Sequence, residues 1–175
     1  MADIRIIEYD EIDSTQEEAK RLVRGGGSLY GTVITAKRQT AGKGRRGKSF
    51  FSRGEDCIYA SFILPPSILT DPGDPSVDFI TKTAGAVVCA AIEKSTLYKP
   101  YIKGVNDVFI DGRKVCGILA EGIPEAVILG IGVNINLEEE DFPEELREIA
   151  GSLYLSEEGR AQFFSDLVEM VSGAF

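Results

Sequence analysis

The chain has 175 residues, enough for one domain with a filled core and too few for two typical domains. Its 19 Lys and Arg against 28 Asp and Glu leave a formal net charge of -9, which argues against a general nucleic-acid or membrane surface. Because the chain has no histidine, Ser-His-Asp and Cys-His nucleophile systems and His-ligated metal sites are excluded. Any catalysis must therefore use other groups, in a chain whose 43% hydrophobic content is typical of a globular protein.

The cysteines and the first residues favour a cytoplasmic location. Cys57, Cys89 and Cys116 lie in apolar stretches without CxxC spacing, which is more typical of reduced core thiols than of a catalytic thiol. Residues 1–13 carry scattered charges and no long apolar run, so they predict neither a signal peptide nor a membrane anchor. We therefore expect a cytoplasmic protein with no membrane partner.

The first third of the chain predicts a strand, a helix and two further strands. Residues 4–9 alternate weakly as a strand does, and residues 14–17 have the Ser-x-x-Glu form of a capping box. A helix should begin at that serine and end at the glycine run 25–27, which is too flexible to continue it. Residues 31–37 and 57–64 are rich in β-branched and apolar side chains and predict two strands, joined by a polar loop that contains glycine.

The middle of the chain predicts a connection, a long helix and a hairpin. Residues 65–75 hold four of the seven prolines and predict a surface connection. Residues 108–119 predict a strand, an Asp-Gly type I′ turn and a returning strand. Residues 77–94 repeat apolar side chains at helical spacing, and their buried stripe should comprise Ala84, Val87, Val88, Ala91 and Ile92.

The last part of the chain completes the expected fold. Residues 126–137 predict a strand that two glycines interrupt, and helices are expected around residues 143–149 and 160–171. Strands therefore cluster in the middle and helices on the flanks. This order predicts an α+β fold with a mixed, largely antiparallel sheet and helices packed on one face.

The basic loop, residues 39–48, is the first segment that could carry chemistry. Four cations and three glycines fall in the seven positions 42–48 of an otherwise acidic chain. Glycines let backbone N–H groups approach a phosphate, and Lys and Arg add charge-assisted hydrogen bonds to its oxygens. The spacing is not that of a Walker A loop. The loop therefore predicts an anion site, with a solvated basic loop as the alternative.

Three other segments lie in or beside predicted strands. In residues 101–107, Lys103 precedes a glycine and an Asn-Asp turn, from which its ammonium could reach a cleft, although many such segments are simply turns. Residues 117–121 form the return strand of the hairpin. In residues 130–136, alternation points two glycines to one face, which predicts either room for a flat ligand or a close strand crossing.

Five motifs follow one another along residues 7–136: Asp13-Ser14-Thr15-Gln16, the basic loop, Lys-Gly-Val-Asn-Asp at 103–107, Lys-Val-Cys-Gly-Ile-Leu-Ala-Glu at 114–121, and Gly-Ile-Gly-Val-Asn-Ile-Asn at 130–136. They resemble the catalytic domain of biotin protein ligases. That family usually has Asp-Ser-Thr-Asn, Gln-Thr-Ala-Gly-Arg-Gly-Arg-Arg-Gly-Arg, Lys-Trp-Pro-Asn-Asp, Lys-Val-Ala-Gly-Ile-Leu-x-Glu and Gly-Ile-Gly-Ile-Asn-Val-Asn. Any one motif could arise by chance, but five in the same order make the resemblance specific.

The resemblance implies an enzyme that uses biotin, ATP and Mg²⁺. Such enzymes condense biotin with ATP to biotinyl-5′-adenylate and pyrophosphate, then transfer the biotinyl group to a lysine of a biotin carboxyl carrier protein or domain. Because the attack of a carboxylate on the α-phosphorus brings anions together, Lys, Arg and Mg²⁺ can assist it without histidine. No nucleic-acid partner is expected, and a homodimer is left open.

The resemblance also implies roles by motif position. The catalytic groups would be Lys103, Arg45 and Lys43, with Lys103 as the central cation. The biotin-binding residues would be Ser14, Thr15, Gln39, Gly42, Lys43, Lys103 and Gly117. The nucleotide-binding residues would be Arg45, Arg46, Asn106, Gly130, Gly132 and Asn134. The Mg²⁺ ligands stay unassigned between Glu121 and Asp107, and residues 42–48 should be poorly ordered until biotin and ATP bind.

The chain departs from the family pattern in three places. Lys43 and Lys48 replace arginines, and Gly104 and Val105 replace the Trp-Pro of the lysine motif. For residues 1–175 we expect a single catalytic domain, without an N-terminal DNA-binding domain and without the family's small C-terminal β domain.

The alternatives to a biotin protein ligase are a lipoate or octanoate ligase-type enzyme, and a biotin-binding protein with weak or no ligase activity.

Overall fold

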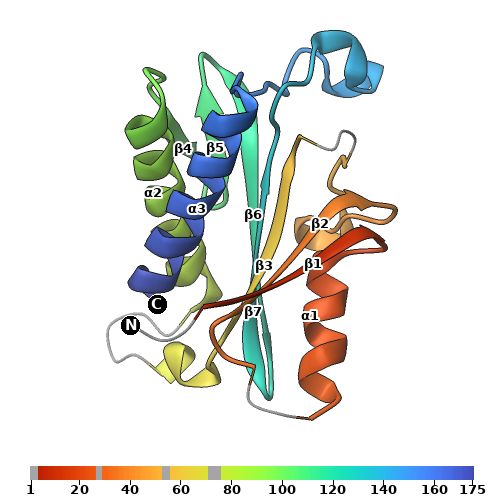
Figure 1. The fold of residues 1–175 in the computed structure, drawn as a ribbon, viewed down its shortest axis with the longest axis vertical. Helices are drawn as coiled ribbons and strands as arrows, with labels where there is room; N and C mark the ends of the chain where they lie inside the picture. The colour runs from red at the N-terminus through yellow and green to blue at the C-terminus, as the bar shows by residue number, and fades with distance from the viewer. Residues whose placement is uncertain (1–3, 27–28, 53–55, 71–75) are drawn as a thin grey trace.

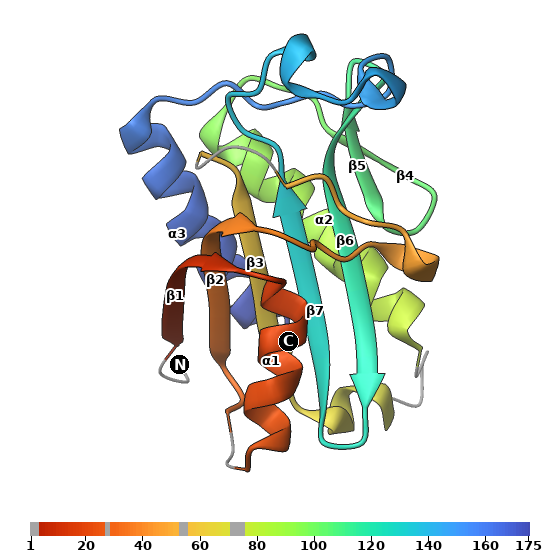
Figure 2. The same ribbon diagram turned by 90° about the vertical axis from the view of Figure 1, so that its right-hand side faces the viewer.

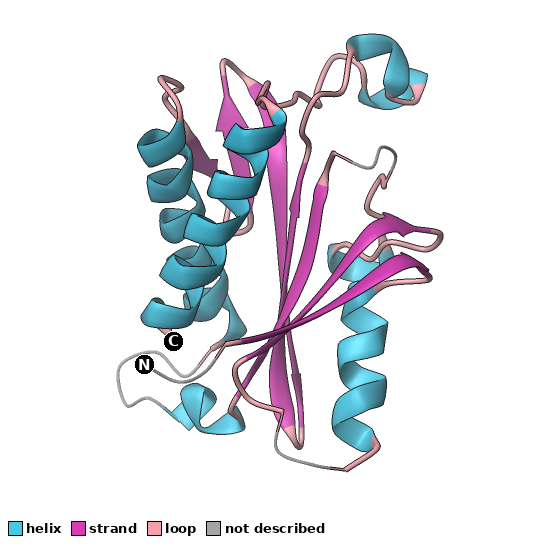
Figure 3. Ribbon diagram, in the orientation of Figure 1, coloured by secondary structure: helices cyan, strands magenta, loops and turns pink. Residues whose placement is uncertain are grey.

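The computed structural model describes residues 4–26, 29–52, 56–70 and 76–175 (Figure 1). Its strands are β1 (Arg5–Ile12), β2 (Thr32–Gln39), β3 (Ile58–Leu64), β4 (Tyr101–Lys103), β5 (Asp107–Ile110), β6 (Arg113–Ile123) and β7 (Ala126–Val133). Its α-helices are α1 (Thr15–Arg24), α2 (Val77–Ser95) and α3 (Glu157–Ala174). The strand and helix arrangement is drawn by type in Figure 3.

One seven-stranded sheet runs through the molecule in the order β1-β2-β3-β7-β6-β5-β4. The β1–β2 pair is parallel, and the other described strand pairs are antiparallel. The sheet is therefore mixed and largely antiparallel, which confirms the predicted α+β class. The long central strands β3, β7 and β6 carry the residues that face the site.

Helices cover both faces of the sheet, which differs from the predicted placement on one face. The helices α2 and α3 pack together on one face, and α1 lies against the opposite face (Figures 1 and 2). Alternation along the strands explains the split, because Ile34, Ile63 and Ile128 point toward Ala19 and Val23 of α1. Strand β3 is buried along its whole length, as a strand covered on both faces must be.

The helix α1 begins and ends as its sequence predicts. The Ser14 side chain caps its N-terminus and accepts a hydrogen bond from the backbone N–H of Glu17 at 3.5 Å. Gly25 caps its C-terminus, where its N–H donates to the carbonyl of Arg21. Gly27, the last glycine of the predicted run, lies outside the described residues. These caps set the direction in which the side chains at the start of α1 enter the site.

The hairpin prediction is confirmed, and the structure adds a strand before it. Asp111 and Gly112 both have positive φ, 49° and 81°, as a type I′ turn between β5 and β6 requires. The segment that precedes the hairpin forms the short edge strand β4, paired antiparallel with β5. Lys103 therefore ends an edge strand.

The predicted helix at 143–149 is wrong, whereas the final helix is confirmed as α3. Within the earlier segment only a 3₁₀ turn forms, at Glu144–Leu146. The chain then leaves helical geometry because it pairs with β6: the Lys114 N–H donates to the carbonyl of Ile149, and the Gly151 N–H to that of Lys114, both at 2.8 Å. In the predicted connection 65–75, Pro66–Thr70 forms another 3₁₀ turn and residues 71–75 lie outside the described part.

The long helix α2 buries its predicted stripe. Ala84, Val88, Ala91 and Ile92 are fully buried, and Val87 is partly buried against them. Cys57, Cys89 and Cys116 are not in disulfides, and Cys57 and Cys116 are buried. Among the described helices, none combines the length and the apolar character needed to cross a membrane.

Candidate active site

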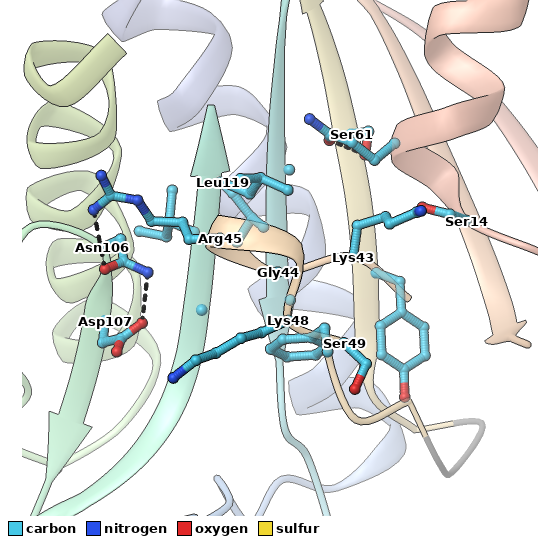
Figure 4. Close-up of a pocket in the computed structure, with 18 of the residues that line it drawn as sticks. Ser14, Lys43, Gly44, Arg45, Lys48, Ser49, Ser61, Asn106, Asp107 and Leu119 are labelled. Carbon is cyan, nitrogen blue, oxygen red and sulfur yellow. Dashed lines mark hydrogen bonds between the residues drawn. The ribbon is translucent and has the colours of Figure 1, made fainter. Parts of the chain in front are cut away.

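A cavity of about 440 Å³ opens on the face of the sheet that carries α1. It lies between the N-terminus of α1, the basic loop, the turn 104–107 and the strands β3, β6 and β7 (Figure 4). In Figure 2 the chain after β2, drawn in orange, crosses in front of β7 and β6, and its residues 43–46 and 48–50 line the cavity. The fold thus brings the segments singled out in the sequence to one place.

Most of the residues assigned by motif position line this cavity. They are Ser14, Thr15, Gln39, Lys43, Arg45, Arg46, Asn106, Gly117, Gly130 and Gly132. Lys103, Gly42 and Asn134 are not among the lining residues. The lining also includes side chains that were not assigned from the sequence, of which Gln16, Lys48, Phe50, Ser61, Asp107 and Lys114 matter most below.

The floor of the cavity is polar and buried. Gln39 Oε1 accepts hydrogen bonds from the backbone N–H and the hydroxyl of Thr15, at 2.8 and 3.1 Å. Ser61, on β3, lies with its Oγ 3.0 Å from Thr15 Oγ1 and 3.0 Å from Gln16 Oε1. All four side chains are buried although they are polar. The floor can therefore recognise a small polar group that replaces water there.

An aromatic wall is formed by Phe50, directly after the basic loop. A Cβ at Gly132 would come within 2.6 Å of the Phe50 ring, and one at Gly117 within 2.9 Å. These two glycines therefore make room for a protein side chain, which then shapes the cavity. Tyr59 stands edge-on to this ring, and burial raises the pKa of its phenol, so the hydroxyl stays neutral. An aromatic residue beside a glycine-rich basic loop was the signal that could have identified Phe50.

The rim of the cavity is cationic and held in place by acidic and amide groups. The basic loop supplies Lys43, Arg45, Arg46 and Lys48, and β6 supplies Lys114. The loop bends back on itself, since Arg46 and Gly47 adopt positive φ, 56° and 74°, and the Gly44 N–H donates to the Lys48 carbonyl. A ring of positive charge around an open mouth favours an anionic ligand.

Three contacts orient two of these cations, Arg45 and Lys114. Arg45 Nη2 lies 3.2 Å from Asp78 Oδ1 at the start of α2. Arg45 Nη1 lies 3.5 Å from Asn106 Oδ1 (Figure 4). Lys114 Nζ lies 2.8 Å from Asp107 Oδ1, which also accepts from the Asn106 amide. The Asn-Asp turn therefore positions both an arginine and a lysine.

The three assigned residues outside the lining have other contacts. Lys103 Nζ lies 5.0 Å from the centre of the Phe109 ring, on the edge strand β4. Asn134 donates to the Gly151 carbonyl at 3.0 Å, and Gly42 leaves room for Ser52, whose Oγ would be 2.6 Å from a Cβ there. These contacts support the backbone around the cavity rather than its interior.

A bulge in β6 explains why Lys114 reaches the cavity. Val108 pairs with Cys116 but Phe109 pairs with Lys114, so Val115 is an extra residue in β6. The bulge brings the Lys114 side chain next to Gly117, with Cε 3.4 Å from the position of a Cβ there. Simple alternation from Gly117 would have sent Lys114 to the other face.

The carboxylates near the cavity decide whether it could hold a magnesium ion. Within the described residues, no group of three or more acidic or cysteine side chains is arranged to hold a metal ion. Asp107 lines the cavity, whereas Glu121 pairs with Lys20 and accepts from Gln16. Because Mg²⁺ is often held by one or two carboxylates plus substrate phosphates, the lining fits a Mg²⁺ that a nucleotide brings with it.

Comparisons with known proteins show which proteins this chain is similar to. A model of the biotin/lipoate A/B protein ligase family matches residues 10–137. The bifunctional ligase/repressor BirA of Bacillus spizizenii is 37% identical over 85% of this chain and 46% of its own length. The biotin–acetyl-CoA-carboxylase ligase of Mycobacterium tuberculosis is 30% identical over 80% of this chain and 51% of its own length. The chain thus spans about half the length of these curated relatives.

Solved structures show the same similarity. The biotin protein ligase from Aquifex aeolicus in complex with biotin and ATP superposes with a TM-score of 0.80 at 31% identity, over 97% of this chain and 69% of that one. The biotin protein ligase from Leishmania major in complex with biotinyl-5-AMP has a TM-score of 0.71 at 20% identity, a likeness of fold.

Proposed function

The chain belongs to the biotin/lipoate A/B protein ligase family, and we propose that it activates biotin with ATP and passes the biotinyl group to a lysine of a biotin carboxyl carrier protein or domain. One observation carries the proposal: a single cavity joins a buried polar floor to a cationic rim. The floor suits the ureido ring of biotin, and the rim suits the phosphates of ATP. The acid end of biotin would then meet the α-phosphate between them.

The biotin end of the proposal relies on side chains that exclude water. Thr15, Gln39 and Ser61 offer buried oxygen and amide groups to the ureido ring, as a site for a polar heterocycle needs. The Phe50 ring and the apolar strand residues behind it would flank the remainder of the acid. This combination orients the carboxylate toward the rim.

The nucleotide end relies on fixed cations. Lys114 and Arg45 are each held by a partner, Asp107 and Asp78, before any substrate arrives. We assign Lys114 the role of the central cation that contacts the carboxylate and the α-phosphate, in place of Lys103. Fixed positive charges at the position where negative charge concentrates lower the barrier of such a reaction. Mg²⁺ would neutralise the triphosphate, with Asp107 as the lining carboxylate suited to hold it.

The same cavity weighs against the lipoate or octanoate alternative. A dithiolane ring or a hydrocarbon chain has no N–H groups for the floor, and burying Thr15 and Ser61 beneath it would leave their oxygens without a new partner. The binding-protein alternative differs only in chemistry, because it keeps the floor but lacks turnover. The two can therefore be separated by one assay.

The test is biotin-dependent exchange of labelled pyrophosphate into ATP with Mg²⁺, with lipoate and octanoate in parallel. Exchange with biotin alone is the expected result. Exchange with lipoate or octanoate but not biotin would select that enzyme class. Biotin binding by calorimetry without exchange would make the chain a binding protein. Transfer is then tested by mass spectrometry of a carrier domain with its acceptor lysine, against a Lys→Arg carrier.

Location and assembly belong to the same proposal. A cytoplasmic location is supported by three cysteines that form no disulfide, as is usual in that reducing compartment. A homodimer would be seen as a doubled mass in analytical ultracentrifugation.

A further inference from the structure

The Gln16 side chain is held at three points although it was not assigned a role by motif. Its Nε2 donates to Glu121 Oε2 at 2.9 Å and to the Ile128 carbonyl at 3.0 Å, and its Oε1 lies 3.0 Å from Ser61 Oγ. The side chain is 3% exposed and lines the cavity. A buried amide with this many contacts has one orientation.

Hydrogen-bond counting gives the direction of each contact. A carboxylate and a carbonyl only accept, so both N–H groups of Gln16 are committed to Glu121 and Ile128. Its Oε1 must therefore face Ser61 and accept the single hydroxyl proton of that serine. The hydroxyl proton of Thr15 is in turn within reach of Gln39 Oε1 at 3.1 Å. Both hydroxyl protons are then used within the protein, and the lone pairs of Ser61 and Thr15 remain for a ligand.

We infer that Gln16 is a positioning residue that makes the cavity floor an acceptor surface, and so selects acyl substrates whose ring carries N–H donors. The inference rests on the proposed function and deepens it. Gln16 acts through Ser61: without its Oε1, the Ser61 proton can turn to Thr15 Oγ1, also 3.0 Å away. The floor would then offer fewer acceptors to the ring. Fixing these protons before binding removes an ordering cost.

Glu121 and Lys20 keep the amide in this orientation. Lys20 Nζ lies 2.9 Å from Glu121 Oε2 and 3.1 Å from Glu17 Oε1. Burial lowers the pKa of Lys20, but hydrogen bonds to the two glutamates outweigh it and raise the pKa above its ordinary value, so the ammonium stays charged. Lys20 and Gln16 both donate to Glu121 Oε2, so this carboxylate oxygen links the lysine to the amide. Glu121 is thus an orienter of the floor, since it is not among the cavity-lining residues.

Gly130 leaves the space that Gln16 needs. A Cβ at position 130 would lie 2.6 Å from Gln16 Oε1, while the nearest backbone atom, the Leu119 carbonyl oxygen, would be at an ordinary 3.5 Å. Alanine at position 130 therefore conflicts with the Gln16 side chain and with little else. This predicts that the two positions are energetically coupled.

The first experiment measures biotin affinity by calorimetry in Gln16→Met and Glu121→Leu. Methionine keeps the length of glutamine without its amide, so we expect the Kd for biotin to rise about tenfold, with the Kd for ATP unchanged. Glu121→Leu should weaken biotin by at least about threefold, and Glu121→Gln, which retains an acceptor, should restore it. Glu125→Leu replaces an exposed glutamate in the turn between β6 and β7, and this matched control should bind biotin as wild type does.

Kinetics then separate positioning from general damage. In pyrophosphate exchange the expected change is a raised KM for biotin with kcat within about twofold of wild type. Gly130→Ala should weaken biotin in the wild-type background and have no further effect in Gln16→Ala. A loss of the same size in both backgrounds would overturn the coupling and with it the inference.

The outcomes distinguish this inference from the proposed function. If wild type binds biotin and both Gln16→Met and Glu121→Leu bind it within twofold of wild type, the inference fails and the proposed function stands. If wild type binds no biotin, both fail. Should Gln16→Met not unfold cooperatively in urea, Glu121→Leu and the Gly130→Ala cycle decide the question alone.

Discussion

Replacing Lys114 by methionine removes the ammonium that β6 brings to the cavity and keeps a side chain of similar length. In the structure this ammonium lies 2.8 Å from Asp107, within the cavity lining. Lys103→Met is the matched variant, because Lys103 is exposed and its ammonium lies over the Phe109 ring at 5.0 Å. Comparing the two variants shows which lysine serves as the central cation of the proposed reaction.

The expected magnitudes differ for the two lysines. Loss of one group that stabilises charge in a transition state typically costs about 100-fold or more in kcat, which we expect for Lys114→Met. The Lys114 and Asp107 side chains are 34% and 27% exposed, so their ion pair contributes at most about 1 kcal/mol to stability. Asp107 also keeps its hydrogen bond from Asn106. For Lys103→Met we expect the activation free energy of exchange to change by about 0.5 kcal/mol, which is roughly twofold in rate. Its free energy of unfolding should change by no more than about 0.5 kcal/mol, as for other surface substitutions.

The assay is biotin-dependent pyrophosphate exchange, with urea unfolding of each variant as the control for folding. The expected result is loss of exchange in Lys114→Met with a nearly unchanged free energy of unfolding. If Lys103→Met loses exchange and Lys114→Met keeps it, the motif position identifies the cation and our geometric argument is refuted. If both variants retain full exchange, neither lysine has the proposed role.

Further predictions concern the wall, the loop and the acid stability of the fold. Gly132→Ala should push the Phe50 ring from its place, lower the free energy of unfolding by about 1–3 kcal/mol and weaken biotin binding, as denaturation and calorimetry would measure. Asp78→Asn should free Arg45 and speed tryptic cleavage within residues 42–48, with biotin and ATP protecting the loop; equal cleavage in both proteins, with and without ligands, would contradict this. A hydrogen bond from the Arg21 guanidinium lowers the pKa of Asp13 from 3.8 to about 2. The contribution of the Asp13 carboxylate to stability is therefore present above pH 3.8 and is lost as the pH falls through about 2. Urea unfolding between pH 5 and 2 should therefore show a smaller acid loss for Asp13→Asn than for wild type.

Local sequence determined the elements and several of their ends. The Ser14 cap and the Asp111-Gly112 turn use only neighbouring backbone groups, so residue type and spacing predict them without a fold. The same holds for the long helix α2 and for the concentration of charge in the basic loop. The order of the motifs also indicated the family, because order and spacing are properties of the chain alone.

The tertiary structure decided which face and which neighbour each element meets. The position of α1 depends on both faces of β3 being buried, and the largely apolar sequence of this strand does not say which helix covers which face. The segment 143–149 lost its predicted helix because its backbone pairs with β6, far away in sequence.

The cavity itself depends on contacts between distant residues. Lys114 enters it through a bulge whose register is set by pairing with β5, and alternation within β6 alone sends this side chain to the other face. The Phe50 side chain packs over Gly117 of β6 and Gly132 of β7, and the Gln16 side chain of α1 packs over Gly130 of β7. Sequence thus determined which groups are available, and packing between elements decided which of them meet, because strand register and side-chain contact are properties of the assembled sheet.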